Sequence, residues 1–147
     1  MARKRVLGEL KLPADPQYVL VAKRTAAALG SIMGFDLEGL DELNIAVAQA
    51  CERAIGDSNR RAYESAAELR LIFRATDSGM EIEVNSLAPA GYQPEPKAPI
   101  RRRPAYEPEG YELTLEMIRC FVDEVGYQMD RRTGATRMRL VKYLIDA

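Results

Sequence analysis

The stretch LDELNIAVAQACERAI, Leu40–Ile55, predicts how this chain folds. Apolar and small residues recur in it at steps of three and four, which places them in one stripe along a helix: Leu40, Leu43, Val47, Ala50, Cys51 and Ala54. Asp36 precedes the stretch as a candidate N-cap, and Gly56-Asp57 follows it as a stop signal. The pattern predicts a central core helix, followed by a polar loop over residues 58–65.

Two further helices are predicted on either side of this one. Helical spacing begins at Pro16 and ends at Met33, between Asp15 as N-cap and Gly34 as C-cap. It returns over residues 111–122.

Alternating apolar and polar residues predict the strands, which are expected at 6–12, 68–74, 80–84, 124–130 and 135–144. The middle two are joined by the turn sequence Thr76-Asp77-Ser78-Gly79, and the last two form a second hairpin. Strands that follow one another in pairs favour an antiparallel sheet. The order of elements therefore predicts an α+β two-layer sandwich: about five mostly antiparallel strands, three helices on one face, and a wet polar opposite face.

Composition excludes several classes of function. We expect one domain over residues 1–147, with a net charge of −1 that favours neither a nucleic-acid nor a membrane partner. The chain has no apolar run long enough to cross a membrane and no signal peptide, which predicts a cytoplasmic protein. Because it has no histidine, classical zinc sites and Ser-His or Cys-His catalysis are excluded, and no metal site is expected. Cys51 and Cys120 both fall on apolar helical stripes and are predicted to be buried free thiols.

A proline-rich segment interrupts the regular pattern between the second and third helices. Six of the eight prolines lie between Pro89 and Pro108, and Arg101, Arg102 and Arg103 lie among them. Prolines at this density exclude regular structure, and a loop this long in a compact domain is usually a lid, a binding loop or a disordered segment.

Taken together, four short motifs resemble the bacterial anti-sigma factor serine kinases, a branch of the GHKL (histidine-kinase-like) ATPases. They are KLPADPQYV from Lys11, LNIAVAQACERAI from Leu43, FVDEVGY from Phe121 and MRLVKYL from Met138. The resemblance implies the GHKL fold, with residues 86–109 in place of the lid over ATP. It also implies a role in partner switching, in which such proteins hold a sigma factor and phosphorylate a serine of an anti-anti-sigma protein of the STAS type.

The chain departs from that family where ATP chemistry would take place. The family carries Glu as general base and, four residues later, Asn as magnesium ligand, whereas Gln49 and Arg53 stand at those places. Ser86-Leu87-Ala88 replaces the Asp-x-Gly that reads adenine, and Glu112-Leu113-Thr114 replaces the Gly-Leu-Gly that approaches the phosphates. Glutamine does not accept a proton near neutral pH, and arginine has no lone pair for a cation.

These departures predict a pseudokinase: a binding module for a sigma factor or an anti-anti-sigma protein, with no catalytic residue, cofactor or metal. The alternative is a divergent serine kinase that still uses ATP and magnesium. Arg53 is either a remnant of the nucleotide site or a solvated helix residue. The Arg101–Arg103 triplet is either a partner contact or part of a solvated loop, and the sequence leaves a homodimer open.

Overall fold

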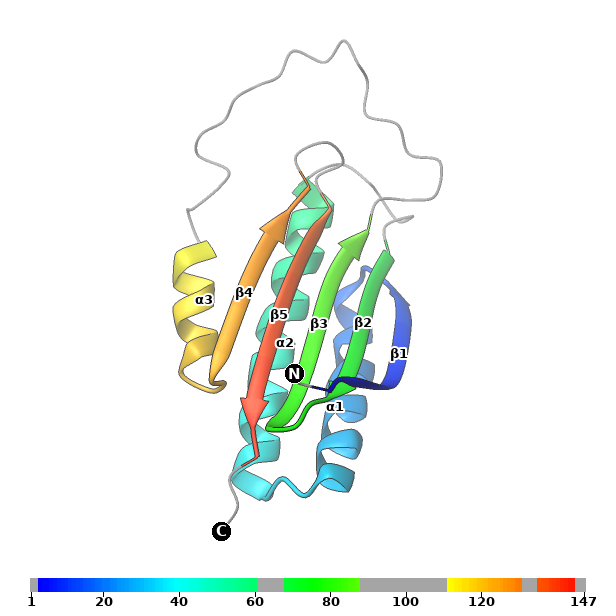
Figure 1. The fold of residues 1–147 in the computed structure, drawn as a ribbon. Coiled ribbons are helices and arrows are strands. Elements are labelled where there is room, and N and C mark those ends of the chain that lie inside the picture. Colours follow the sequence, from blue (N-terminus) through cyan, green and yellow to red (C-terminus); the bar gives the residue numbers. More distant parts are fainter. Residues whose placement is uncertain (1–2, 61–67, 88–110, 131–134, 145–147) are drawn as a thin grey trace.

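The computed structural model describes residues 3–60, 68–87, 111–130 and 135–144. Its antiparallel sheet has the strand order β1-β2-β3-β5-β4, formed by β1 (Arg5–Pro13), β2 (Glu68–Ala75), β3 (Gly79–Leu87), β4 (Glu124–Met129) and β5 (Thr136–Tyr143). A helical layer lies behind it (Figure 1), formed by α1 (Val19–Met33), α2 (Leu37–Arg60) and α3 (Tyr111–Arg119). The predicted two-layer α+β sandwich is confirmed.

The central helix α2 forms because its apolar stripe packs against the sheet. Leu43, Val47 and Ala50 are at most 1% exposed, and α2 packs on β3 and β5 as well as on α1 and α3. Asp36 accepts a hydrogen bond from the amide of Gly39 at 2.8 Å, which confirms the predicted N-cap.

The predicted end of this helix is wrong. The helix continues through Gly56-Asp57 to Arg60, so residues 58–60 are helical and not loop, while 61–65 lie outside the described residues. A glycine inside a helix costs about 1 kcal/mol relative to alanine. Burial of the neighbouring Ala54 and Ile55, 5% and 3% exposed, offsets that cost.

Both predicted caps of the first helical segment are confirmed. Asp15 accepts a hydrogen bond from the amide of Gln17 and begins a short 3-10 turn, η1 (Pro16–Tyr18), from which α1 continues. Gly34 ends α1 in the left-handed conformation with φ 106°, which glycine adopts without the penalty that a side chain brings.

The core lies between α2 and the inner face of the sheet. It is built around residues such as Phe73, Leu71, Ile82, Leu140 and Ile118, each at most 1% exposed. Cys51 belongs to this core, as predicted. The prediction for Cys120 is wrong: its side chain is exposed, because α3 ends at Arg119 and the chain turns before the next core residue, Val122.

The outer face of the sheet is polar as predicted, but its middle is not wet. Glu81 and Glu83 on β3 are only 1% and 5% exposed, because arginines of the neighbouring strands, and Lys4 just before β1, cover them. None of the helices in the described ranges combines the length and the apolar composition that a membrane crossing needs.

Candidate functional site

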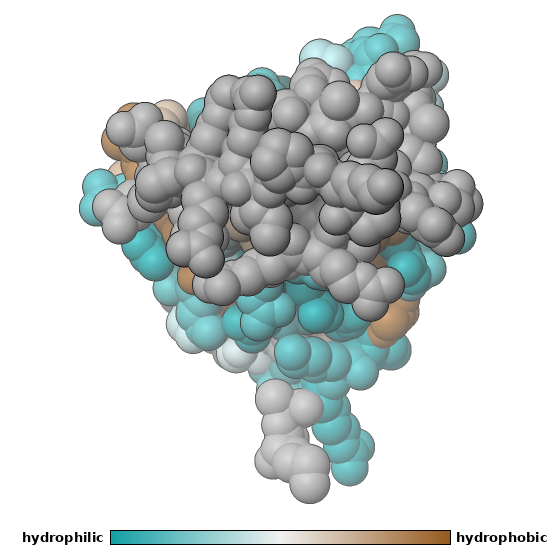
Figure 2. All heavy atoms as spheres, turned by 90° about the horizontal axis from the view of Figure 1, so that it is seen from above, coloured by the Kyte–Doolittle hydropathy of each residue, from teal (hydrophilic) through white to brown (hydrophobic). Residues whose placement is uncertain are grey.

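Two of the positions at which this chain departs from the kinase motifs lie together on α2. Gln49 and Arg53 are one helical turn apart in its second half, and both are half-buried. The carboxyl end of α2 lies at the same end of the molecule as the end of β3 and the start of β5 (Figure 1). Seen from that end, the visible surface of the described residues is mostly hydrophilic, with apolar areas toward its sides (Figure 2).

A buried pair of hydroxyl groups closes the end of the core between β3 and β5. Ser86 follows Ile82 and Val84 on the core-facing side of β3, and it is 1% exposed. Its Oγ lies 2.6 Å from Oγ1 of Thr136 and accepts a hydrogen bond from the Thr136 amide at 3.1 Å. Both hydroxyl oxygens are thus engaged within the protein and carry no charge.

The remaining predicted site residues are only partly described. Thr114 is half-buried near the start of α3, which packs against α2, while Leu113 beside it is 62% exposed. The side chain of Glu112, together with Ala88 and Arg101, Arg102 and Arg103, lies outside the described residues. We refer to Gln49, Arg53, Ser86 and Thr114 as the substituted site.

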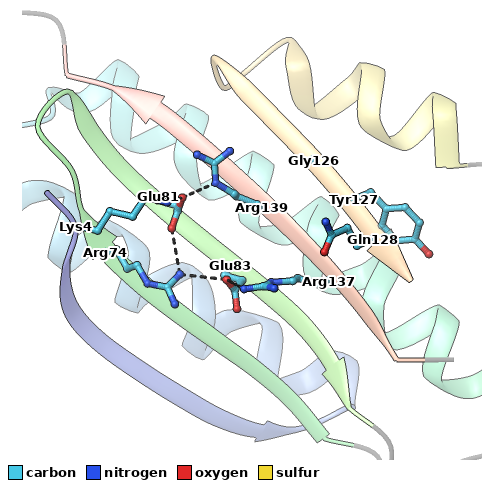
Figure 3. Close-up of a pocket in the computed structure, with 9 residues that line it drawn as sticks. All are labelled: Lys4, Arg74, Glu81, Glu83, Gly126, Tyr127, Gln128, Arg137 and Arg139. Carbon is cyan, nitrogen blue, oxygen red and sulfur yellow. Dashed lines mark hydrogen bonds and ion pairs between the residues drawn. The ribbon is translucent and has the colours of Figure 1, made fainter. Parts of the chain in front are cut away.

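A second constellation lies on the opposite, outer face of the sheet (Figure 3). Glu81 and Glu83 form its floor, and four cations surround them: Lys4, Arg74, Arg137 and Arg139. These groups line a hollow of about 580 Å³, whose rim on β4 is formed by Gly126, Tyr127 and Gln128. We call this feature the basic hollow.

The floor of the basic hollow is held by a shared set of ion pairs. Arg74 Nη1 bridges the two acids, at 3.1 Å from Glu81 Oε2 and 3.1 Å from Glu83 Oε1. Glu81 Oε1 also accepts from Lys4 Nζ at 2.8 Å and from Arg139 Nε. Arg137 Nη2 donates to Glu83 Oε1 at 2.8 Å.

These contacts decide the charge of the floor. Burial alone raises the pKa of the Glu81 carboxyl, but hydrogen bonds from Lys4 and Arg139 outweigh it and lower that pKa to about 2. The pKa of Glu83 is lowered in the same way: its burial opposes ionisation, and hydrogen bonds from Arg137 and Asn85 overcome it. Both carboxylates are therefore ionised throughout the physiological range.

The sequence predicted a polar outer face of the sheet but not that its charged residues form one group. Glu81 and Lys4 are 77 residues apart, and Glu81 and Arg139 are 58 apart. The signal in the sequence was the Arg-x-Arg pair at 137 and 139 together with Glu-x-Glu at 81 and 83. Alternation puts each pair on one face of its strand, but only the order β3-β5 makes them neighbours.

Comparison with known proteins connects this geometry to a family. The sequence profile of the histidine kinase-like ATPase domain matches residues 12–142, which run from the end of β1 to β5. The chain belongs to the histidine kinase-like ATPase domain family. Within the described residues, this histidine kinase-like domain has no group of three or more acidic or cysteine side chains placed to hold a metal ion.

Similar curated proteins are serine-protein kinases named RsbW. The chain is 32% identical to the RsbW of Bacillus velezensis over 78 residues, 52% of this chain and 46% of that protein. It is 29% identical to a Bacillus cereus RsbW, with 54% of this chain and 53% of that protein covered. It is 28% identical to the Bacillus licheniformis RsbW, with 92% of this chain and 84% of that protein covered. The matches thus span about half the length of the first two relatives and most of the third, which makes the chain a distant relative of the RsbW kinases.

Proposed function

We propose that this histidine kinase-like domain is a regulator of the RsbW kind that acts by binding proteins and has lost phosphoryl transfer. Its partners would be a sigma factor, an anti-anti-sigma protein of the STAS type, or both. The family resemblance supports this role in partner switching, and the chemistry of the substituted site supports the loss of catalysis.

The single observation that carries this proposal is the pair Gln49 and Arg53 on one turn of α2. Phosphoryl transfer depends on positioning and on neutralising charge, largely with magnesium. An amide at position 49 is no general base, and a guanidinium at position 53 offers no lone pair and repels a cation. The side chains of Gln49 and Arg53 therefore do not fit a magnesium–nucleotide complex of the family's type.

The hydroxyl pair on β3 and β5 supports the same conclusion. The family's Asp accepts from the adenine amino group, whereas Ser86 presents a neutral oxygen already engaged by Thr136. Ser86 is also only 1% exposed, so adenine could reach its oxygen only if this end of the core opened. The substituted site thus lacks the base, the metal ligand and the adenine acceptor.

Thermal unfolding with MgATP and with MgADP tests the loss of nucleotide binding. A ligand present at a hundred times its dissociation constant stabilises the folded state by about 2.7 kcal/mol, which for a chain of this size raises Tm by roughly 5–10 °C. We expect no such rise at millimolar nucleotide. An RsbW kinase run in parallel is the positive control, and a rise of several degrees for this chain would overturn the proposal.

Capture of partners tests the binding role. The immobilised chain, incubated with lysate of its source cells, should retain a sigma factor or a STAS-type protein, and the purified pair should co-elute in size-exclusion chromatography. Incubating that pair with labelled ATP separates the two hypotheses. Transfer of phosphate to a partner serine would favour the divergent kinase, and failure to bind either class of partner would contradict the regulatory role.

A further inference from the structure

The basic hollow carries more positive than negative charge. Four cations surround two carboxylates, so its lining has a net charge of +2, which Glu124 at its edge, 3.7 Å from Arg139, reduces to +1, in a chain whose overall net charge is −1. Both acids are already shared among several cations. The side chains of Arg137 and Arg139 keep 54% and 41% of their surface exposed. The surplus positive charge is therefore presented to solvent.

The arginines on β5 keep N–H donors that their contacts with the floor do not use. Within the described residues, Arg137 bonds Glu83 through Nη2, and Arg139 bonds Glu81 through Nε, with a longer contact of 3.7 Å from Nη1 to Glu124. A guanidinium has five N–H donors in a rigid fork, so each arginine retains donors that match a carboxylate. The buried floor holds both side chains in place, which lowers the entropy lost on binding.

Gly126 on β4 is what leaves the hollow open. It faces Arg139 across the β4–β5 pair, and a Cβ built at this glycine meets no atom within 4 Å. Its φ is not positive, so the backbone does not require glycine here. A Cβ at this place would stand in open space at the rim of the hollow, and its absence leaves room beside the two arginines.

We propose that the basic hollow binds an acidic segment of a partner protein, with Arg137 and Arg139 holding its carboxylates and the space over Gly126 receiving its chain. A hollow of about 580 Å³ that crosses β2, β3, β5 and β4 has room for several side chains, more than one small anion needs. It lies on the outer face, away from the core-facing substituted site, and so acts whether or not the chain binds nucleotide.

Charge favours this occupant over two others. A second copy of the chain docked face to face would bring together two hollows with a surplus of positive charge, which repel. Nucleic acid is normally bound by a basic domain with an extended stripe of Lys and Arg, whereas this chain has a sequence pI of about 5.6. A short acidic segment matches a local basic patch on a nearly neutral protein.

The test uses a capped hexaglutamate peptide as the probe and a hexaglutamine peptide as its neutral counterpart. In ¹⁵N–¹H spectra of the labelled chain, hexaglutamate should shift the amides of Gly126 and Gln128, and hexaglutamine should not. Fluorescence anisotropy should give an affinity that falls as salt is raised toward about 0.15 M and above, since exposed charges are then screened. Shifts confined to another face would overturn the proposal.

Three variants separate charge from shape. Arg137→Gln with Arg139→Gln removes the surplus charge. Gly126→Leu occupies space in the hollow and leaves the charge unchanged. Each of these two changes should weaken hexaglutamate binding by about tenfold or more. Arg24→Gln with Arg119→Gln is the matched control: it removes the same two charges at exposed residues of α1 and α3 and should leave affinity unchanged. Circular dichroism and Tm establish that each variant is folded, and Arg74 and Lys4 still cover the floor in all of them.

Four results would contradict the assignment. They are equal weakening by the control pair Arg24→Gln with Arg119→Gln, no effect of Gly126→Leu, tighter binding of a duplex DNA of matched charge than of the peptide, and a dimer in light scattering that the hollow variants dissociate. The third would assign the hollow to nucleic acid, and the fourth to a second copy of the chain.

Discussion

Replacing Glu81 by glutamine should cost about 3 kcal/mol of folding free energy near neutral pH, and this cost should shrink in acid. The carboxylate is 1% exposed and receives charge-assisted contacts from Lys4, Arg74 and Arg139. Glutamine keeps the shape of the side chain and removes its charge. The three cations then lose a common anion, and breaking a buried ion pair on one side is strongly destabilising.

The magnitude follows from the pKa of Glu81. Folding lowers that pKa from its ordinary value of 4.5 to about 2, and each unit corresponds to about 1.4 kcal/mol, which gives about 3 kcal/mol. Because the folded-state pKa is depressed, this stabilisation is fully present above pH 4.5. It is lost as the pH falls from 4.5 toward 2 and the carboxylate takes up a proton.

Urea unfolding followed by circular dichroism measures both parts of this prediction. The free energy of unfolding of the native chain and of Glu81→Gln should differ by about 3 kcal/mol at about pH 7 and by much less at about pH 2. Glu116→Gln is the control, since Glu116 is an exposed carboxylate on α3 and its replacement should stay within about 0.5 kcal/mol. A difference below 1 kcal/mol near neutral pH, or one that does not change with pH, would refute the role assigned to the ionised Glu81.

Three further predictions test the packing of the helices and the sheet. Ellman's reagent should modify Cys120 in the folded chain but Cys51 only after unfolding, because Cys51 is fully buried and burial, aided by Glu52, raises its thiol pKa to about 12. In urea unfolding, Gly79→Ala should destabilise the chain by more than about 2 kcal/mol, since its Cβ would lie 2.0 Å from a backbone oxygen of β5. Gly56→Ala, whose Cβ meets nothing within 4 Å, should stabilise α2 by up to about 1 kcal/mol. Equal effects of the two variants would refute this contrast between the two glycines. Asp36→Ala should cost about 1 kcal/mol and leave the unfolding slope unchanged, because it removes the N-cap of α2.

Local patterns in the sequence were sufficient for the order of the elements and for the caps at Asp15, Asp36 and Gly34. The stripe from Leu43 to Ala54 predicts α2 because helix periodicity is a property of neighbouring residues. Asp36 and Gly34 could be assigned as caps for the same reason, since each acts on atoms within about one helical turn. The end of α2 escaped prediction because burial of Ala54 and Ile55, a tertiary contact, outweighs the weak stop signal beside them.

At the candidate sites, too, some features follow from the sequence and others only from the tertiary structure. That Gln49 and Arg53 share one face of a helix follows from their spacing, and the chemistry of those side chains follows from their identity. That Ser86 is tied to Thr136, and that Glu81 and Glu83 are buried under cations, depends on the order β2-β3-β5. Partners separated by 50 or more residues meet only when the sheet is assembled. The alternation of polar residues assigns each side chain to a face of its strand. Tertiary structure alone decides which strand lies beside it, and therefore which charged groups it contacts and how far it is shielded from water.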